Sequence, residues 1–190
     1  MADWERVKWS EARQVLDVLG APPTERGEGE DGPPQQYFLA LRQAGKRAEA
    51  AKFLGQALPR LEAVAWAARA VRDLRGDGVA PAAESKALRA TLLWLQDTTE
   101  ARRRATYDAA EQCDTASAER LAALAAFFSG GSIAPANCPA LPAPRDSAGK
   151  FASGAVLVAA AAAKDLSAAL DACLDAGDAL ARHGLEGEPG

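Results

Sequence analysis

The sequence lacks most of the features that mark an enzyme or a nucleic-acid-binding protein. Its 190 residues contain a single histidine and no GxSxG, HExxH, Walker or dinucleotide-binding motif. That histidine, His183, precedes Gly184 at the predicted end of a helix, where a positive charge suits the helix dipole. The net charge of -4 leaves no excess of the basic residues on which nucleic-acid binding depends. We therefore predict no catalytic constellation, no cofactor and no nucleic-acid partner.

Cysteine and long apolar stretches are also scarce. The three cysteines, Cys113, Cys138 and Cys173, are far apart and odd in number, so they predict neither a disulfide framework nor a zinc site. The first residues are charged where a secretion signal has an apolar core. The longest apolar run, residues 155–163, is far shorter than the ~20 residues of a membrane-spanning helix. These absences predict a cytoplasmic protein without membrane insertion.

Aromatic residues make up only 6% of the chain, and no β-branched or aromatic run alternates long enough to predict a strand. Alanine, the best helix former, is abundant instead. Apolar residues recur at helical spacing along most of the chain, which predicts an all-α protein of about eight helices in one domain. A bundle and the stacked hairpins of a solenoid both fit this pattern, although no residue pattern recurs at a fixed period.

Proline and glycine divide the chain into four predicted segments. These are an N-terminal helical segment, a flexible acidic linker rich in Pro and Gly, the helical domain and a disordered tail: residues 1–20, 21–35, 36–184 and 185–190. We expect the N-terminal helix to dock back on the domain through Trp4 and Trp9. The alternative is that both rings stay available to a partner.

A helix that begins at or near Pro59 is the predicted centre of the fold. Its apolar residues cover about half of the helix surface, more than the stripe of a helix that packs on one side only. Trp66 lies at the edge of this arc, beside Glu62 and Arg69. Two readings stay open for Trp66: a ring buried under a covering segment, and a contact for a partner. Large aromatic side chains are mostly buried, which favours the first.

Three consecutive arginines, residues 102–104, span most of the circumference of a later helix, so at least one of them must turn toward the protein. They form either a docking surface for an acidic partner or phosphate, or ion pairs within the chain. The carboxylates considered for such pairs are Glu62, Asp73, Asp97 and Asp108. We also predict that Asp97 and Glu100 cap the start of this helix. The candidate residues for contact with a partner protein are Trp66, Arg69, Arg102 and Arg103.

Two glycines, Gly130 and Gly131, resemble a phosphate-binding loop only superficially. They follow a predicted helix, whereas phosphate loops precede one, so we interpret them as a helix end. The next residues, 132–145, contain four prolines and predict an extended segment that packs on the domain. Cys138 lies in this segment and has no histidine near it in sequence.

Four segments carry a resemblance to a known family: FLGQALPRLEAVAWAARAV, EARRRAT, LAAFFSGGSIAP and SGAVLVAAA. In their order and spacing they resemble an uncharacterised, all-helical bacterial family, one of the domains of unknown function. Members often have a second tryptophan where this chain has Ala65. The resemblance implies no activity, cofactor or catalytic residue. It implies a loose association with bacterial secretion loci, especially type VI secretion.

These observations lead to one expected function and two alternatives. We expect a non-enzymatic adaptor or accessory factor that binds another protein, such as a secretion component or effector. An immunity-type protein that neutralises a toxin is the first alternative, suggested by the negative charge and the same association. A helical bundle that binds a small ligand or acts as an enzyme is the second, and it requires a deep pocket lined by convergent polar groups. The sequence does not predict the oligomeric state.

Overall fold

The computed structural model describes residues 3–75, 81–135 and 137–185. Within these residues the chain forms nine α-helices, one 3₁₀ helix and no strand beyond an isolated antiparallel bridge between Ser132 and Pro142. The helices are α1 (Ala12–Leu19), η1 (Pro23–Glu25), α2 (Pro34–Gln43), α3 (Arg47–Ala57), α4 (Arg60–Leu74), α5 (Ala82–Gln96), α6 (Glu100–Ala110), α7 (Ala118–Phe127), α8 (Ser147–Ala161) and α9 (Leu166–His183). The all-α prediction is confirmed. The extra helix arises because the chain turns at Gly45, where a φ of 71° suits glycine, and α2 ends before it while α3 begins after it.

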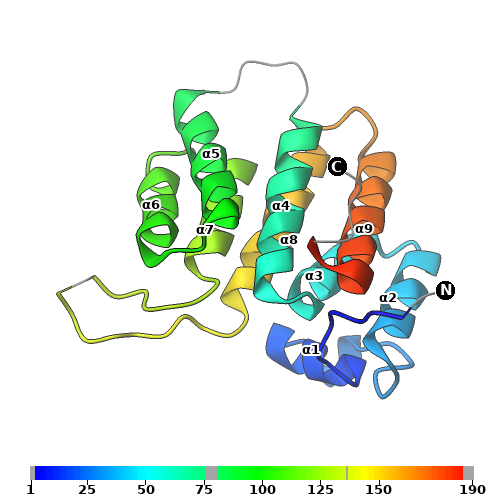
Figure 1. Cartoon of the computed structure of the whole chain (residues 1–190). Coiled ribbons are helices and arrows are strands. Elements are labelled where there is room, and N and C mark those ends of the chain that lie inside the picture. The colour runs from blue at the N-terminus through cyan, green and yellow to red at the C-terminus, as the bar shows by residue number, and fades with distance from the viewer. Residues whose placement is uncertain (1–2, 76–80, 136, 186–190) are drawn as a thin grey trace.

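Helix α8 runs through the centre of the molecule (Figure 1). It packs against α3, α4, α7 and α9, which come from both halves of the chain. Helices α5, α6 and α7 lie together on one side of this centre, and α2, α3 and α9 lie on the other. In a solenoid each hairpin would pack only on its neighbours in sequence. The fold is therefore a bundle and not a stack of hairpins.

Small residues let α8 approach its neighbours closely. Four of its residues have no exposed surface: Ala152, Ala155, Val156 and Ala160. Near its start, Gly149 meets Gly55 of α3, where an added Cβ on Gly149 would lie 2.7 Å from the carbonyl oxygen of Gly55. The backbones of the two helices are thus in direct contact, which any larger side chain at either position would prevent.

Side-chain caps mark the starts of several described helices. Ser117 and Asp165 accept the backbone N–H bonds expected of N-caps for α7 and α9. The prediction for α6 is wrong, because its N-cap is Thr99, which accepts from the N–H of Arg102. Asp97 instead ends α5. The carboxylate of Glu100 does not cap the helix and accepts hydrogen bonds from Arg103 and Arg104 instead.

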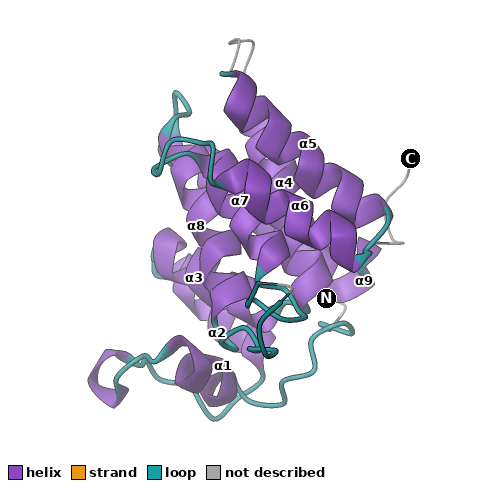
Figure 2. Ribbon diagram, turned by 90° about the vertical axis from the view of Figure 1, so that its left-hand side faces the viewer, coloured by secondary structure: helices purple, strands orange, loops and turns teal. Residues whose placement is uncertain are grey.

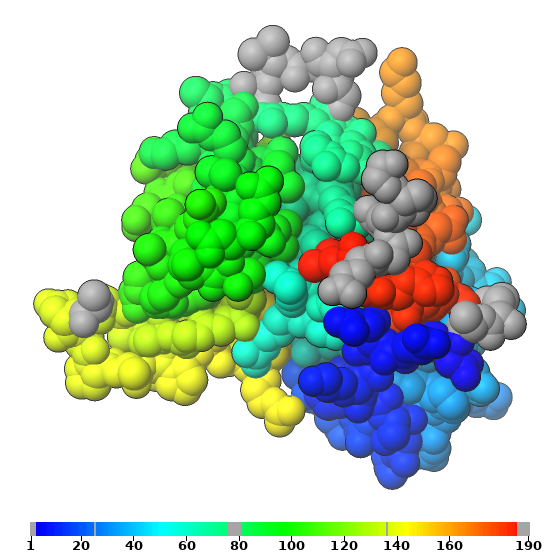
Figure 3. Space-filling view, viewed as in Figure 1, coloured from blue at the N-terminus to red at the C-terminus, as the bar shows by residue number. Residues whose placement is uncertain are grey.

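The N-terminal segment docks on the end of α9, as expected (Figure 3). Trp4 is buried, its Nε1 donates to the Oδ1 of Asp178 at 2.6 Å, and its ring lies 5.2 Å from that of Phe38. The N–H of Arg6 donates to the carbonyl oxygen of Ala181. Trp9 is half-buried against the same core.

Residues 21–35, predicted to be a flexible solvated linker, are held to their neighbours instead. Gly32 and Glu30 accept the first backbone N–H groups of α1, and the guanidinium of Arg26 donates to the carbonyl oxygen of Ala21. The N–H of Gly27 donates to the hydroxyl of Tyr37. Figure 2 shows α1 and this segment at one end of the molecule, beside α2 and α3. Composition missed this because several of the contacts are made by backbone groups, which any residue type can supply. Of the predicted tail, 185–190, only Leu185 lies within the described residues.

Candidate functional site

Trp66, the first candidate for partner contact, lies inside the protein. Its side chain is 1% exposed, and its Nε1 donates to the carbonyl oxygen of Cys173 at 2.7 Å. Helix α9 is the covering segment, and Gly177 leaves room for the ring. The buried reading of Trp66 is confirmed. Burial also raises the pKa of the Cys173 thiol to about 11, so this cysteine is a core residue and not a reactive one.

Arg103 is also internal, and it organises the end of α7. It is 4% exposed, and its guanidinium donates to Glu100, to the carbonyl oxygen of Phe127 and to that of Ser132. It also lies 4.8 Å from the centre of the Phe127 ring, a cation–π contact. Ion pairing within the chain is thus the correct reading of Arg103, although its partner is Glu100 and not one of the four acids considered.

The two neighbouring arginines also make contacts within the chain. Arg104 pairs with Glu100 at 2.8 Å and donates to the carbonyl oxygens of Ser132 and Ala134. Arg102 pairs with Asp97 at 3.0 Å, a partner that was considered. The two arginines that bind Glu100, Arg103 first, lower the pKa of its carboxyl below the usual value. Glu100 is therefore an ionised anchor for the loop after α7.

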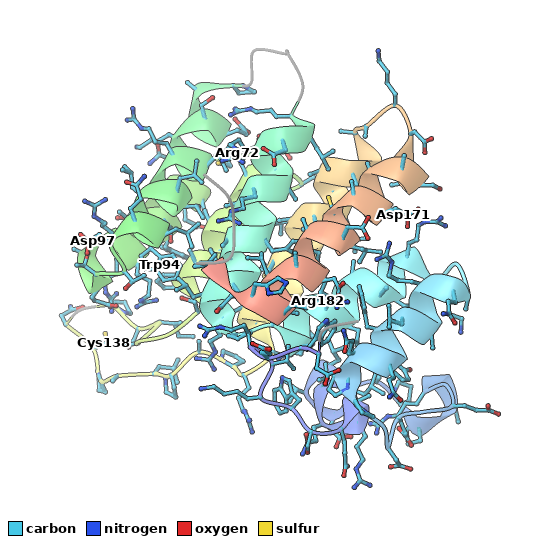
Figure 4. All side chains as sticks on the ribbon, turned by 45° about the vertical axis from the view of Figure 1, so that its right-hand side comes forward. Arg72, Trp94, Asp97, Cys138, Asp171 and Arg182 are labelled. Atoms are coloured by element: carbon cyan, nitrogen blue, oxygen red, sulfur yellow. The ribbon has the colours of Figure 1, made fainter. Side chains whose placement is uncertain are left out.

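The four candidate residues do not form one surface. Trp66 points toward α9, whereas Arg103 points toward the loop that follows α7. Arg102 pairs with Asp97, so the two side chains lie together. Figure 4 shows Asp97 on the opposite side of the molecule from Asp171 of α9. Arg69 is half-buried on α4. Arg102 and Arg69 thus keep some exposure, but they cannot contact a partner together with Trp66.

A groove of about 680 Å³ lies between α1, α2, α3 and α8, and no candidate residue belongs to it. Its floor is apolar. The side chains that form the floor are Leu16, Leu19, Tyr37, Leu41, Phe53 and Leu157. Phe53 and Leu16 are buried, while Leu19, Leu41 and Leu157 stay partly exposed in the open groove. Such a floor binds apolar side chains of a ligand, because their transfer from water is favourable.

Charged side chains border this groove on α3 and α8. Lys46, Lys52 and Lys150 contribute positive charge, and Glu28 and Glu49 contribute negative charge. Lys150 is engaged by Asp146 at 2.6 Å, which lowers the pKa of that carboxyl. The ammonium groups of Lys46 and Lys52 have no carboxylate partner in the part of the chain that the structure describes. They remain available to an acidic group of a ligand.

Sequence reasoning missed this groove because four helices build it. Leu16 and Leu19 come from α1, Leu41 from α2, and Leu157 from α8. Each leucine lies on an apolar helix face that also serves the core. One sequence signal was the pair of lysines at the α3 side of the groove, Lys46 at the N-cap and Lys52 within the helix, although Glu49 lies between them.

Neither a metal site nor a membrane span is found among the residues that the structure describes. Among the residues described, no group of three or more His, Cys, Asp and Glu side chains is placed to hold a metal ion. His183 is exposed at the end of α9. Cys138 is exposed on the loop after α7. No helix in the described part combines the length and the apolar character needed to cross a bilayer.

Comparison with known proteins gives one match. The model of a family of unknown function, DUF6931, matches residues 37–181. Neither a curated protein nor a solved structure matches the chain.

Proposed function

The chain belongs to the DUF6931 family of unknown function, and we propose that it is a non-enzymatic adaptor that binds an amphipathic segment of another protein in the groove between α1, α2, α3 and α8. The observation that supports this most is the row of partly exposed leucines, Leu19, Leu41 and Leu157, along one open groove. Apolar grooves of this kind receive the apolar face of a partner helix.

The charges at the groove favour a particular composition for that segment. Lys46 and Lys52 stand on the α3 side of the rim without carboxylate partners among the described residues. A segment with acidic residues next to its apolar anchors would pair with both lysines. Such rim contacts contribute to orientation and association rate more than to affinity.

A protein segment suits the groove better than an enzyme substrate. Its volume lies within the range of ligand pockets, roughly 300–1,000 Å³, but polar groups do not converge on its floor. The hydroxyl of Tyr37, a polar group at that floor, already accepts a hydrogen bond from the N–H of Gly27. The lysines and glutamates lie around it on α3, on α8 and on the loops beside these helices. Groups placed in this way can orient a bound chain, and they form no acid–base pair.

We further propose that the partner is a component or effector of a type VI secretion system. This rests on the family resemblance of the four sequence segments and not on the groove. The identity of the bound protein tests it, and a toxin found in the groove would support the immunity alternative instead.

Site-specific crosslinking in the native host tests the adaptor proposal. A photoreactive amino acid replaces Ala40, an exposed residue of α2 that lines the groove, and Gln43, an exposed residue of the same helix that does not. We expect one protein to be crosslinked from position 40 and not from position 43. The crosslinked peptide should carry apolar residues at helical spacing with acidic neighbours.

Charge reversal supplies the second arm of this experiment. Lys46→Glu with Lys52→Glu should reduce crosslinking from position 40 about tenfold if both ion pairs form. Lys86→Glu with Lys164→Glu, exposed lysines away from the groove, should leave it unchanged. If position 40 crosslinks no more protein than position 43, the groove does not bind a partner.

A further inference from the structure

We propose that a second cavity, between the first turns of α4 and α8, binds the phosphate group of a small organic phosphate. The cavity has a volume of about 390 Å³. It is lined by the C-terminal end of α3, the N-terminal ends of α4 and α8, and the segment before α1. The groove of the proposed adaptor function lies apart from it, so neither proposal rests on the other.

Three basic side chains from distant parts of the sequence meet at this cavity: Lys8, Arg60 and Arg145. None of the described residues that line it is Asp or Glu. None of the three has a carboxylate partner within the described chain, although Arg60 donates one hydrogen bond to the carbonyl oxygen of Ser129. Asp146, next to Arg145, is bound to Lys150. Local positive charge in a chain of net charge -4 indicates an anionic ligand.

Backbone donors add to this positive charge. The cavity is lined by Pro59 and Arg60 at the start of α4 and by Ala148 and Gly149 at the start of α8. In the described structure neither helix has a side-chain cap that accepts its first N–H groups. Helix N-termini with free N–H groups attract anions through those donors and through the helix dipole.

Gln56 also lines the cavity, but its amide oxygen is not part of the proposed site. Gln56 is 8% exposed, and its Oε1 is enclosed against Gly149 of α8, with no surface open to the cavity and no hydrogen-bond partner among the described groups. The proposed site therefore consists of the basic side chains, the free N–H groups and the apolar walls.

The remaining walls are apolar and fit the organic part of such a ligand. Trp9, Val18 and Leu58 line the cavity together with the basic residues. The volume exceeds what one phosphate group fills and lies within the range of small-molecule sites. The indole of Trp9 offers a flat surface against which a planar group can pack.

Calorimetry on the full-length protein with three probes tests the proposal. Adenosine monophosphate supplies a phosphate on a planar organic group, inorganic phosphate supplies the anion alone, and adenosine supplies the organic part alone. We expect adenosine monophosphate to bind in about the micromolar-to-millimolar range, inorganic phosphate more weakly, and adenosine not measurably. Because phosphate contacts are charge-dependent, affinity should fall as salt is raised.

Matched variants assign the binding to this cavity. Lys8→Gln with Arg145→Gln removes two exposed charges that line it and should weaken binding of adenosine monophosphate at least about tenfold. Arg89→Gln with Lys164→Gln removes two exposed charges elsewhere and should change affinity less than about twofold.

Any one of the following results would overturn the proposal. These are no binding of either phosphate probe at about 10 mM, a concentration that detects even very weak complexes, equal binding of adenosine and its monophosphate, and equal loss of affinity in both double variants. Tighter binding of inorganic phosphate than of adenosine monophosphate would also contradict it, because the organic group would then contribute nothing.

Discussion

Arg103 connects α6 to the end of α7 and to the loop that leads to α8. Its guanidinium donates to the carbonyl oxygens of Phe127 and Ser132 and to the carboxylate of Glu100. We expect Arg103→Lys to lower the free energy of unfolding by about 2–4 kcal/mol, because lysine keeps the charge but lacks the planar set of donors. Urea denaturation followed by circular dichroism measures the change.

Arg102 provides the control for this substitution. It is adjacent in sequence, its side chain is 41% exposed, and it pairs with Asp97. Arg102→Lys should change the free energy of unfolding by about 0–1 kcal/mol, as for other exposed ion pairs. Equal effects of the two substitutions would contradict the structural importance of Arg103.

Trp66 shows where residue-level reading of the sequence succeeded and where it stopped. Its position beside Glu62 and Arg69 indicated the edge of an apolar arc, yet Trp66 and Glu62 are both buried. The buried face of α4 is wider than its apolar residues alone suggest, because α9 covers Trp66 and the guanidinium of Arg6 pairs with Glu62. A helical projection shows the residues of one helix only. It cannot show that Trp66 is buried by α9, which lies more than a hundred residues later in the chain.

At the scale of elements, the approach of α9 to α3 and α4 depends on one glycine. A Cβ added to Gly177 would lie 2.5 Å from the Cδ2 of Leu54 and 2.9 Å from the Nε1 of Trp66, both fully buried side chains. Alanine raises helix propensity by about 1 kcal/mol, but overpacking costs more. We therefore expect Gly177→Ala to destabilise the protein by about 1–2 kcal/mol net.

Gly154→Ala in α8 is the matched control. Its added Cβ would meet only the Cδ1 of Leu121, at the ordinary contact distance of 3.6 Å. Without a clash the gain in helix propensity should remain, so this variant should be more stable than the parent by about 0.5–1 kcal/mol. Thermal denaturation measures both variants. The close contact at α9 is refuted if the two substitutions shift stability in the same direction.

Helix boundaries were predictable where a local signal decides them. Ser117 and Asp165 each accept a backbone N–H bond within one turn of the chain, and Gly45 takes the positive φ of a turn. The start of α6 was not predictable, because Glu100 fits a capping box but is held by Arg103 and Arg104. Hydrogen bonds from two charged arginines stabilise a carboxylate more than a hydrogen bond from one backbone N–H does. Thr99 is the N-cap of α6 instead.

The two cavities could not be predicted for a related reason. Their lining residues come from helices that meet only after folding, and the basic residues at the second cavity, Lys8, Arg60 and Arg145, are separated by tens of residues in sequence. The segment 21–35 reads as a solvated linker by composition, but its backbone closes against α1.

At the scale of the whole molecule, ion pairs within helices and between them make stability depend on pH. The pKa values of Glu100, Asp146 and Asp171 are lowered by hydrogen bonds and charge from Arg103, Lys150 and Arg47 respectively. A carboxyl group whose folded pKa is lowered stabilises the fold above its unfolded pKa, about 3.9 for Asp and 4.3 for Glu, and this stabilisation is lost as pH falls through the folded value.

We therefore expect the melting temperature to be nearly constant from about pH 6 to 8 and to fall below about pH 4. Differential scanning calorimetry at a series of pH values measures it. Glu100→Gln should lower the melting temperature at neutral pH and flatten the dependence below about pH 5, since one of the titrating groups is removed. A melting temperature that rises on acidification would contradict these ion pairs.

Both proposed sites depend on α1, although the family match begins only at residue 37. Leu16 and Leu19 of α1 form part of the floor of the groove, and Val18 of α1, with Trp9 just before it, contributes to the second cavity. Helix α1 packs mainly against α2 and α3, at the edge of the bundle. Its detachment should therefore remove binding while most of the helical bundle stays folded.

Val15→Asp tests this dependence. Val15 is fully buried on the inner face of α1, and a carboxylate at this position requires α1 to detach from the bundle. We expect crosslinking from position 40 and binding of adenosine monophosphate to be lost together, with new hydrogen exchange confined to α1 and its contacts. Arg13→Ala, on the exposed side of the same helix, should preserve both. If Val15→Asp undocks α1 and both ligands still bind, α2–α9 alone form the sites and the walls assigned to α1 are not needed.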